Sequence, residues 1–186
     1  INKIGLYIDL IPPKVNIIAL EKDKPRSINT ILFSISSRIK QLFSKLNKSY
    51  KFHPAQNHWK FIGKNYIDQQ KKYDVAIAYS QGLPTYYTSS KIKALKKYCW
   101  INTDYNIAGY NPKLDKKYYA TFDNIVLVSK KAEEVFNRIF PDFKNTLIIY
   151  DIISKKMVLE LSKFKVKSEL SKSTIKILTI GRLVVK

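Results

Sequence analysis

The sequence predicts an α/β fold, in which a Rossmann-like parallel sheet is flanked by helices. Two observations carry this prediction. Short apolar runs, the pattern of strands buried on both faces, recur along the chain. Stretches with apolar residues three and four positions apart, the pattern of helices, fall between them. Strands that alternate with helices in this way are typical of layered domains with a parallel sheet.

Composition bounds the class of protein. The chain has 186 residues, of which 45% are hydrophobic and 26% charged, so it can bury a core and is not of the disordered class. Its one cysteine, Cys99, excludes an internal disulfide framework and, in an apolar strand, suits a small buried hydrophobe better than a nucleophile. We find no apolar run that could span a membrane and no signal peptide pattern, so a cytoplasmic location is expected.

The first third of the chain predicts one strand and two helices. Residues 15–20 suit a strand after a Pro-Pro break, and residues 27–47 form the clearest amphipathic helix. Its apolar stripe is typical of a helix packed on a sheet, whereas Phe33, off the stripe, hints at a helix on a membrane surface. A second helix is expected over residues 55–71. Its histidines lie five apart, which fits no helical metal site, so no metal is predicted.

The middle of the chain predicts where function lies. Residues 74–79 form a buried strand, and a loop of small residues, 80–85, follows it before a short helix. Residues 97–102 form the next strand, which opens into a polar cluster at residues 103–106. Both polar loops follow the carboxyl ends of predicted strands, so they lie at the same edge of the sheet. Ligands of open parallel sheets bind outside this edge, and we therefore expect the site there.

The last third continues the alternation. We predict helices at residues 113–121, 129–140 and 154–163, with strands at 124–128, 147–150 and 175–180. Residues 165–174 are polar and aperiodic, as expected of a linker. The predicted organisation has three parts: a first domain over residues 1–164, the linker, and the start of a second domain at 175–186. The first domain is expected to lack its beginning.

Several reaction classes leave no trace in the sequence. There is no nucleophile elbow, P-loop or dinucleotide fingerprint. The net charge of +20 comes mainly from lysine, and three interpretations remain open. The first is that the charge reflects A/T-rich codons, and the second is that it attracts the protein to an anionic membrane surface. The third, binding to nucleic acid, is the least favoured because no RNA-binding signature accompanies the charge. A non-enzymatic basic α/β module that binds nucleic acid is therefore kept as the alternative function.

Five segments, taken in order, resemble the acceptor-side domain of family 4 glycosyltransferases, the large retaining GT-B group that builds bacterial surface polysaccharides. They are YDVAIAYSQGLPT at residues 73–85, KKYCWINTDY at 96–105, VLVS at 126–129, IIYDIIS at 148–154 and ILTIGRL at 177–183. The resemblance covers roughly residues 70–186. The chain departs from the family at Asn102, where many members have His, and at Asp151, where many have Asn.

The resemblance implies an enzyme of the hexosyltransferase type. A nucleotide sugar would be the donor, a lipid-linked or polysaccharide glycan of the lipopolysaccharide or capsule kind the acceptor, and no cofactor would be needed. A peripheral position on the inner face of the plasma membrane would follow. The family's donor-site glutamates belong to a second domain, so this 186-residue chain alone is expected to be inactive.

The candidate site residues combine this resemblance with local chemistry. Arg182 follows a strand and a glycine, where its planar fork suits donor diphosphate oxygens. On the acceptor side, Asp104 can orient or deprotonate a hydroxyl, although a turn cap is an equal interpretation, and Asn102 can bind sugar without titrating. The acceptor-binding candidates are Gly82, Thr85, Thr103 and Tyr105.

Overall fold

A computed structural model describes residues 8–18, 20, 27–47 and 52–164 of the chain. The contacts within it divide the chain into two compact units, Ile1–Asp151 and Ile152–Lys186. In the second unit the described element is helix α6 (Lys155–Leu161), which begins at Ser154, whose hydroxyl accepts a hydrogen bond from the backbone N–H of Met157. The predicted linker at residues 165–174, the strand at 175–180 and Arg182 lie outside the described residues.

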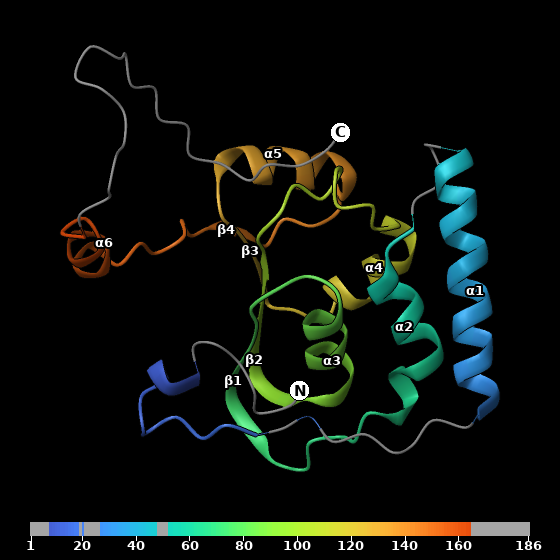
Figure 1. Cartoon of the computed structure of the whole chain (residues 1–186), viewed down its shortest axis with the longest axis horizontal. Helices are drawn as coiled ribbons and strands as arrows, with labels where there is room; N and C mark the ends of the chain where they lie inside the picture. The colour runs from blue at the N-terminus through green and yellow to red at the C-terminus, as the bar shows by residue number, and fades with distance from the viewer. Residues whose placement is uncertain (1–7, 19, 21–26, 48–51, 165–186) are drawn as a thin grey trace. The chain divides into compact units, whose positions relative to one another are not determined.

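The first unit is built on a parallel sheet of four strands that stand in chain order (Figure 1). They are β1 (Lys72–Ala78), β2 (Lys93–Ile101), β3 (Asn124–Leu127) and β4 (Thr146–Ile148). Neighbouring strands pair in parallel, with Ala78 opposite Cys99 and Cys99 opposite Ile125. The predicted α/β fold with a Rossmann-like parallel sheet is therefore confirmed.

Three helices connect these strands and lie on one face of the sheet. They are α3 (Leu83–Lys91), α4 (Pro112–Tyr119) and α5 (Lys130–Ile139). Right-handed crossovers between strands in consecutive order place every connecting helix on the same side. Helices α4 and α5 begin where the sequence indicates, since Asn111 caps α4 and Ser129 caps α5 through hydrogen bonds to backbone N–H groups. Helix α3 begins at Leu83, inside the stretch of residues 80–85 that was predicted as a loop.

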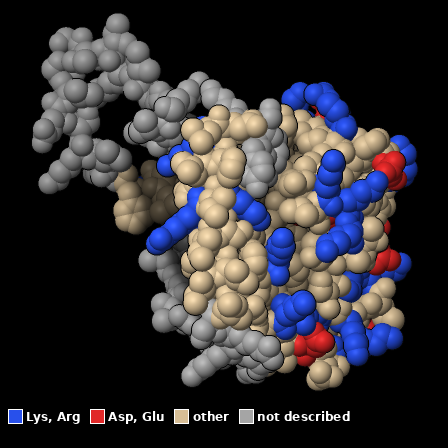
Figure 2. Space-filling model, turned by 90° about the vertical axis from the view of Figure 1, so that its right-hand side faces the viewer, with Lys and Arg blue, Asp and Glu red and all other residues tan. Residues whose placement is uncertain are grey.

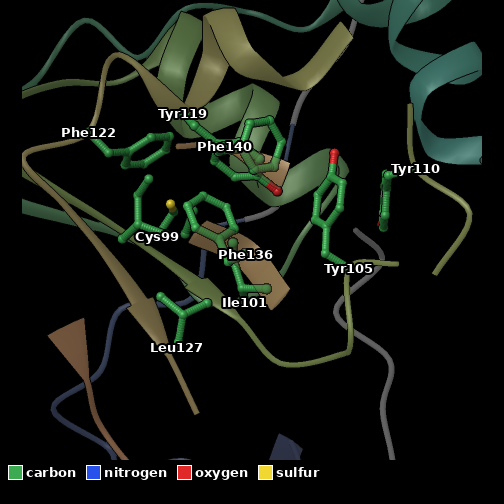
Figure 3. Close-up of a cluster of buried hydrophobic side chains, with 11 residues drawn as sticks. Cys99, Ile101, Tyr105, Tyr110, Tyr119, Phe122, Leu127, Phe136 and Phe140 are labelled. Carbon is green, nitrogen blue, oxygen red and sulfur yellow. The ribbon is translucent and has the colours of Figure 1, made fainter. Parts of the chain in front are cut away.

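The core lies between the sheet and these helices. Cys99 and Ile101 of β2 and Leu127 of β3 point toward the aromatic rings of Phe136 and Phe140 (Figure 3). Cys99 is fully buried, and this burial raises the pKa of its thiol well above the ordinary value. The expectation that Cys99 acts as a small buried hydrophobe is confirmed by this position.

The opposite face of the sheet is open within the described residues. Val75 and Ile77 of β1 are 51% exposed, and Tyr79 just after it is 60% exposed. The ring of Tyr79 lies 5.3 Å from that of Trp100, the next side chain on this face. The unit thus has one covered face and one apolar face without a helix over it.

Strand β2 begins four residues earlier than predicted, at Lys93 instead of residue 97. Lysines in the first part of β2 interrupt the apolar run on which the prediction of the strand was based. Lys97 nevertheless faces the helices, because its ammonium donates hydrogen bonds to the carbonyl oxygens of Thr88 and Ser89 near the end of α3. The desolvation that goes with this position lowers the pKa of Lys97.

Two secondary-structure predictions for the first third of the chain are wrong. Residues 15–18 and 20 form no strand, and the nearest regular element is a 3₁₀ turn, η1 (Ile8–Leu10). The helix expected over residues 55–71 ends early, as α2 (Pro54–Ile62) followed by the 3₁₀ turn η2 (Gly63–Asn65). The indole of Trp59 occupies the space that a side chain at Gly63 would need. The ring of Tyr66 stacks on this indole, with 5.6 Å between the ring centroids, at the point where the chain turns back toward β1.

Helix α1 (Ser27–Leu46) has the predicted bounds to within a residue, but it is not packed on the sheet. It lies outside α2 (Figure 1) and contacts it with its polar side. Asn57 of α2 is the centre of this contact, because it accepts hydrogen bonds from Ser36 and Lys40 and donates one to Ser37. Phe33 also turns inward, 5.5 Å from the ring of His58.

The apolar stripe of α1 consequently faces away from α2. Its members are 44–76% exposed: Ile28, Ile31, Leu32, Ile35, Ile39, Leu42, Phe43 and Leu46. The interpretation of the stripe as a core-facing surface is corrected by this orientation. The cause is that serines and Asn57 can satisfy one another's hydrogen bonds. The apolar stripe stays largely exposed and lines an open pocket together with Phe61 of α2.

Candidate functional site

The loops after β1 and β2 meet at the carboxyl edge of the sheet, as the sequence predicts. Gln81 joins them: its side-chain amide donates hydrogen bonds to the carbonyl and the hydroxyl of Thr103, at 3.2 and 2.9 Å. Its carbonyl oxygen accepts a third from the backbone N–H of Asn102. Gln81 is buried, so the two loops form one rigid edge.

A hollow of about 480 Å³ lies over this edge. It is lined by His53, Ser80, Gln81, Thr103, Asp104, Ile107, Ala108 and Tyr110. Polar groups of both loops therefore face one space, and two ring side chains from elsewhere in the chain close it. A cavity of this size with a few convergent polar groups is of the kind that takes a small ligand or one sugar ring.

The two ring side chains, His53 and Tyr110, stack on each other with centroids 3.8 Å apart. His53 also begins α2, because its Nδ1 accepts a hydrogen bond from the backbone N–H of Ala55. Partial burial lowers the pKa of His53, which favours the neutral imidazole that this bond requires. Burial, together with the charge of Asp115, raises the pKa of Tyr110 to about 12.

Asp104 lines the hollow and also holds its own loop. Its Oδ1 accepts hydrogen bonds from the backbone N–H groups of Asn106 at 2.8 Å and Ile107 at 3.3 Å. Among the hydrogen bonds of the described residues, none reaches Oδ2. One oxygen of the carboxylate thus caps the turn, as the alternative interpretation of this residue expects, and the other remains for a ligand.

Gly82 has a packing reason for being glycine. Its φ is +79°, a region that disfavours other residues, and a Cβ there would lie 2.8 Å from the Tyr110 hydroxyl oxygen. Thr85 is buried, and its hydroxyl donates to the carbonyl of Ser80. Both residues shape the loop after β1 from beneath, and neither lines the hollow.

Tyr105 and Asn102 also lie outside the lining of the hollow. Tyr105 is buried in the core, and its hydroxyl donates to Oδ2 of Asp115 at 2.5 Å. Asn102 is exposed, and its side-chain amide donates to the carbonyl of Tyr79. Of the six acceptor-side candidates, the structure brings only Thr103 and Asp104 to the hollow.

Sequence patterns did not reveal a buried polar cluster around Asp115. Asp115 is 1% exposed and accepts hydrogen bonds from Gln56, Tyr86 and Tyr105. Desolvation raises the pKa of its carboxyl, and these three hydrogen bonds partly oppose that shift. The one signal available was an acidic residue in the first turn of a helix, which ordinarily indicates a favourable charge at an exposed helix start.

No group of three or more metal-ligating side chains occurs among the residues that the structure describes. In the same part of the chain, none of the helices is both long enough and apolar enough to cross a membrane. Comparisons of the chain with models of protein families, with curated proteins and with solved structures found no match.

Proposed function

We propose that this chain is the acceptor-side domain of a glycosyltransferase similar to family 4. The enzyme would transfer a sugar from a nucleotide-sugar donor to a lipid-linked or polysaccharide acceptor in cell-surface glycan synthesis. One observation carries the proposal: the polar loops after β1 and β2 share one hollow at the carboxyl edge of a parallel sheet. Both loops belong to segments in which the sequence resembles the family.

Each side chain of the hollow has a task in this proposal. The free oxygen of Asp104 orients the acceptor hydroxyl that attacks the donor, or takes its proton. The Thr103 hydroxyl and the Ser80 side chain bind neighbouring sugar hydroxyls, while the stacked rings of His53 and Tyr110 form a flat wall for a sugar face. Arg182 would contact the donor diphosphate, a role that rests on the sequence alone. The scheme needs neither metal nor cofactor.

Binding of the acceptor tests this proposal directly. The ¹⁵N-labelled chain is titrated with a panel of soluble oligosaccharides taken from lipopolysaccharide cores and capsules. We expect amide shifts that concentrate in residues 80–82 and 103–110 for at least one glycan, and that disappear in a Thr103→Val variant. Binding that leaves these residues unshifted, or a response to random oligonucleotides alone, would contradict the proposal and favour the nucleic-acid module.

Helix α1 supports the membrane part of the proposal. Its apolar stripe is exposed, and the exposed Arg38 and Lys45 flank that stripe on the same helix. The face of the unit that carries α1 shows many basic and few acidic side chains (Figure 2). Apolar side chains that enter the acyl boundary while lysines contact anionic headgroups would bring the domain to a lipid-linked acceptor.

Co-sedimentation with vesicles tests attachment through α1. We expect binding to rise with the content of anionic phosphatidylglycerol and to fall steeply with salt. Ile35→Asp should weaken it at least about tenfold, because a charge then enters the stripe. Ser34→Asp, the same charge change one residue away and off the stripe, is the matched control. Equal binding of both variants, or equal binding to neutral vesicles, would refute attachment through the stripe.

A further inference from the structure

A second cavity, of about 510 Å³, lies between α2, α3 and α4 and shares no lining residue with the hollow at the sheet edge. Its floor is aromatic: Trp59, Tyr86 and Tyr118 lie side by side, with 5.9 Å between the rings of the first two and 4.7 Å between those of the last two. Leu114 and Gly63 complete the floor. Nothing in the proposed sugar transfer uses this space.

Five lysines line the same cavity: Lys40, Lys60, Lys64, Lys91 and Lys117. Lys91 is neutralised by an ion pair with Asp68 at 2.8 Å. The other four make no ion pair with any described carboxylate. Desolvation lowers the pKa of Lys40, and the neighbouring charge of Lys60 lowers it further, so two ammonium groups repel each other at this rim.

One acidic residue, Asp115, also lines the cavity, but it does not neutralise the rim. It is 1% exposed, and its two oxygens are occupied by Gln56, Tyr86 and Tyr105. The carboxylate therefore belongs to the structure under the floor. The cavity therefore combines an aromatic lining with four lysines that make no ion pair among the described residues. One of them, Lys40, donates a hydrogen bond to the neutral side chain of Asn57.

We propose that this cavity is a binding site for a phosphorylated ligand with an apolar body. The phosphate lies among Lys40, Lys60, Lys64 and Lys117, and the apolar body lies on Trp59 and Tyr118. A phosphate that enters the rim relieves the repulsion between the lysines, and the aromatic floor favours a ligand that carries more than a bare anion. Both a lipid headgroup with its glycerol and acyl stem and a soluble aryl phosphate have this chemistry.

Titration of the ¹⁵N-labelled full chain with phenyl phosphate is the first test. We expect saturable amide shifts at residues 59–64 and 114–118, and at least about fivefold weaker binding of inorganic phosphate, which lacks the apolar body. The double variant Lys60→Gln/Lys64→Gln should raise the Kd at least about tenfold, since two of the charges at the phosphate are gone. Both lysines are exposed, so the variant should keep the melting temperature of the natural chain.

Lys130→Gln/Lys144→Gln is the matched control, because these exposed lysines lie outside the cavity and the change in net charge is the same. It should leave the Kd within about twofold. Equal loss of binding in both double variants, shifts away from the cavity, or equal affinity for inorganic and phenyl phosphate would overturn the proposal.

A second arm distinguishes the two sources of the phosphate. Dihexanoyl phosphatidic acid, used as a monomer, should compete with phenyl phosphate if the site takes a lipid headgroup. If it does not compete while phenyl phosphate binds as described, the site takes a soluble phosphate ester. Because the lining is distinct from that of the hollow, a Thr103→Val variant should bind phenyl phosphate normally, whatever the outcome of the glycan titration.

Discussion

The side-chain amide of Gln81 donates a 2.9 Å hydrogen bond to the Thr103 hydroxyl, and this bond joins the ends of two neighbouring strands. Loss of the Gln81 side chain should release both loops at once. We expect Gln81→Leu to lower the free energy of unfolding by about 1–3 kcal/mol, because partly buried donors and acceptors lose their partner. Gln70→Leu, at an exposed position, should change it by less than about 0.5 kcal/mol. Urea denaturation measures both, and equal effects would show that Gln81 does not hold the loops.

Gly82 and Gly109 give a pair of variants that share a positive φ but differ in their surroundings. Their φ angles are +79° and +78°, so an alanine at either site costs about 1 kcal/mol of backbone strain. At Gly82 the new Cβ would also meet the Tyr110 hydroxyl oxygen at 2.8 Å, whereas at Gly109 its nearest neighbour is the Phe52 carbonyl oxygen at 3.3 Å. Gly82→Ala should therefore lower the melting temperature more, by several degrees. Equal shifts in a calorimetric scan would refute the clash.

Asp115 should be the most costly carboxylate to remove among those of the described residues. Asp115→Ala leaves the Gln56 amide and two tyrosine hydroxyls buried without their acceptor, so we expect a loss of about 3–5 kcal/mol. Asp142→Ala breaks the exposed ion pair with Lys116 and should cost less than about 1 kcal/mol. Chemical denaturation compares them, and a small loss at Asp115 would mean that water replaces its role.

His53 should make stability depend on pH. Its folded pKa lies below the ordinary value of 6.5, so the unfolded chain binds more protons between these two values. Stability should therefore be complete above about pH 6.5 and fall as pH decreases through the folded pKa. His53→Asn keeps a side-chain acceptor at the start of α2 and should flatten this dependence between pH 5 and 7.5.

His58→Gln serves as the control for His53, because it removes the other histidine of the chain. It should leave the dependence in place. Tyr110, which stacks on His53, does not interfere, since its pKa is about 12. A slope that survives in His53→Asn but not in His58→Gln would contradict the assignment.

The proposed sugar transfer makes a prediction for Asp104. Asp104→Asn retains Oδ1 as the acceptor for Asn106 and Ile107, so folding should be nearly unchanged. Loss of the carboxylate charge should lower kcat by about 10² in a form of the enzyme that includes the donor domain. Asn102→His should be tolerated, because Asn102 is exposed and lies outside the hollow. Full turnover of Asp104→Asn would leave the residue as a turn cap only.

The elements from α4 to α6 were predictable because local signals agree there with tertiary structure. Ser129, for example, is a capping residue in the sequence and a cap in the structure. The outward orientation of the apolar stripe of α1 was not predictable, since an apolar stripe in a sequence does not show whether another element packs against it. The start of β2 was hidden because Lys97 is buried through hydrogen bonds to α3, which no periodicity records.

The site was predictable in position but only partly in membership. Parallel strands end at one edge, so the meeting of the loops at residues 80–85 and 103–106 follows from topology. Which side chains face the hollow depends on long-range contacts. Tyr105 turns inward and donates its hydrogen bond to Asp115. Gln56 also contacts Asp115, although the two residues are 59 positions apart in the sequence, too far for any local pattern to indicate the contact.

The single cysteine offers a way to observe how the sheet opens. Cys99 sits near the carboxyl end of β2, is fully buried and has a raised pKa, so a thiol reagent cannot modify it while the native packing persists. Its labelling rate would report transient exposure of one defined point of the sheet, without any engineered probe. Measured with and without a bound ligand, that rate gives the local opening free energy beneath the two loops and reveals whether occupancy of the hollow tightens the strands under it.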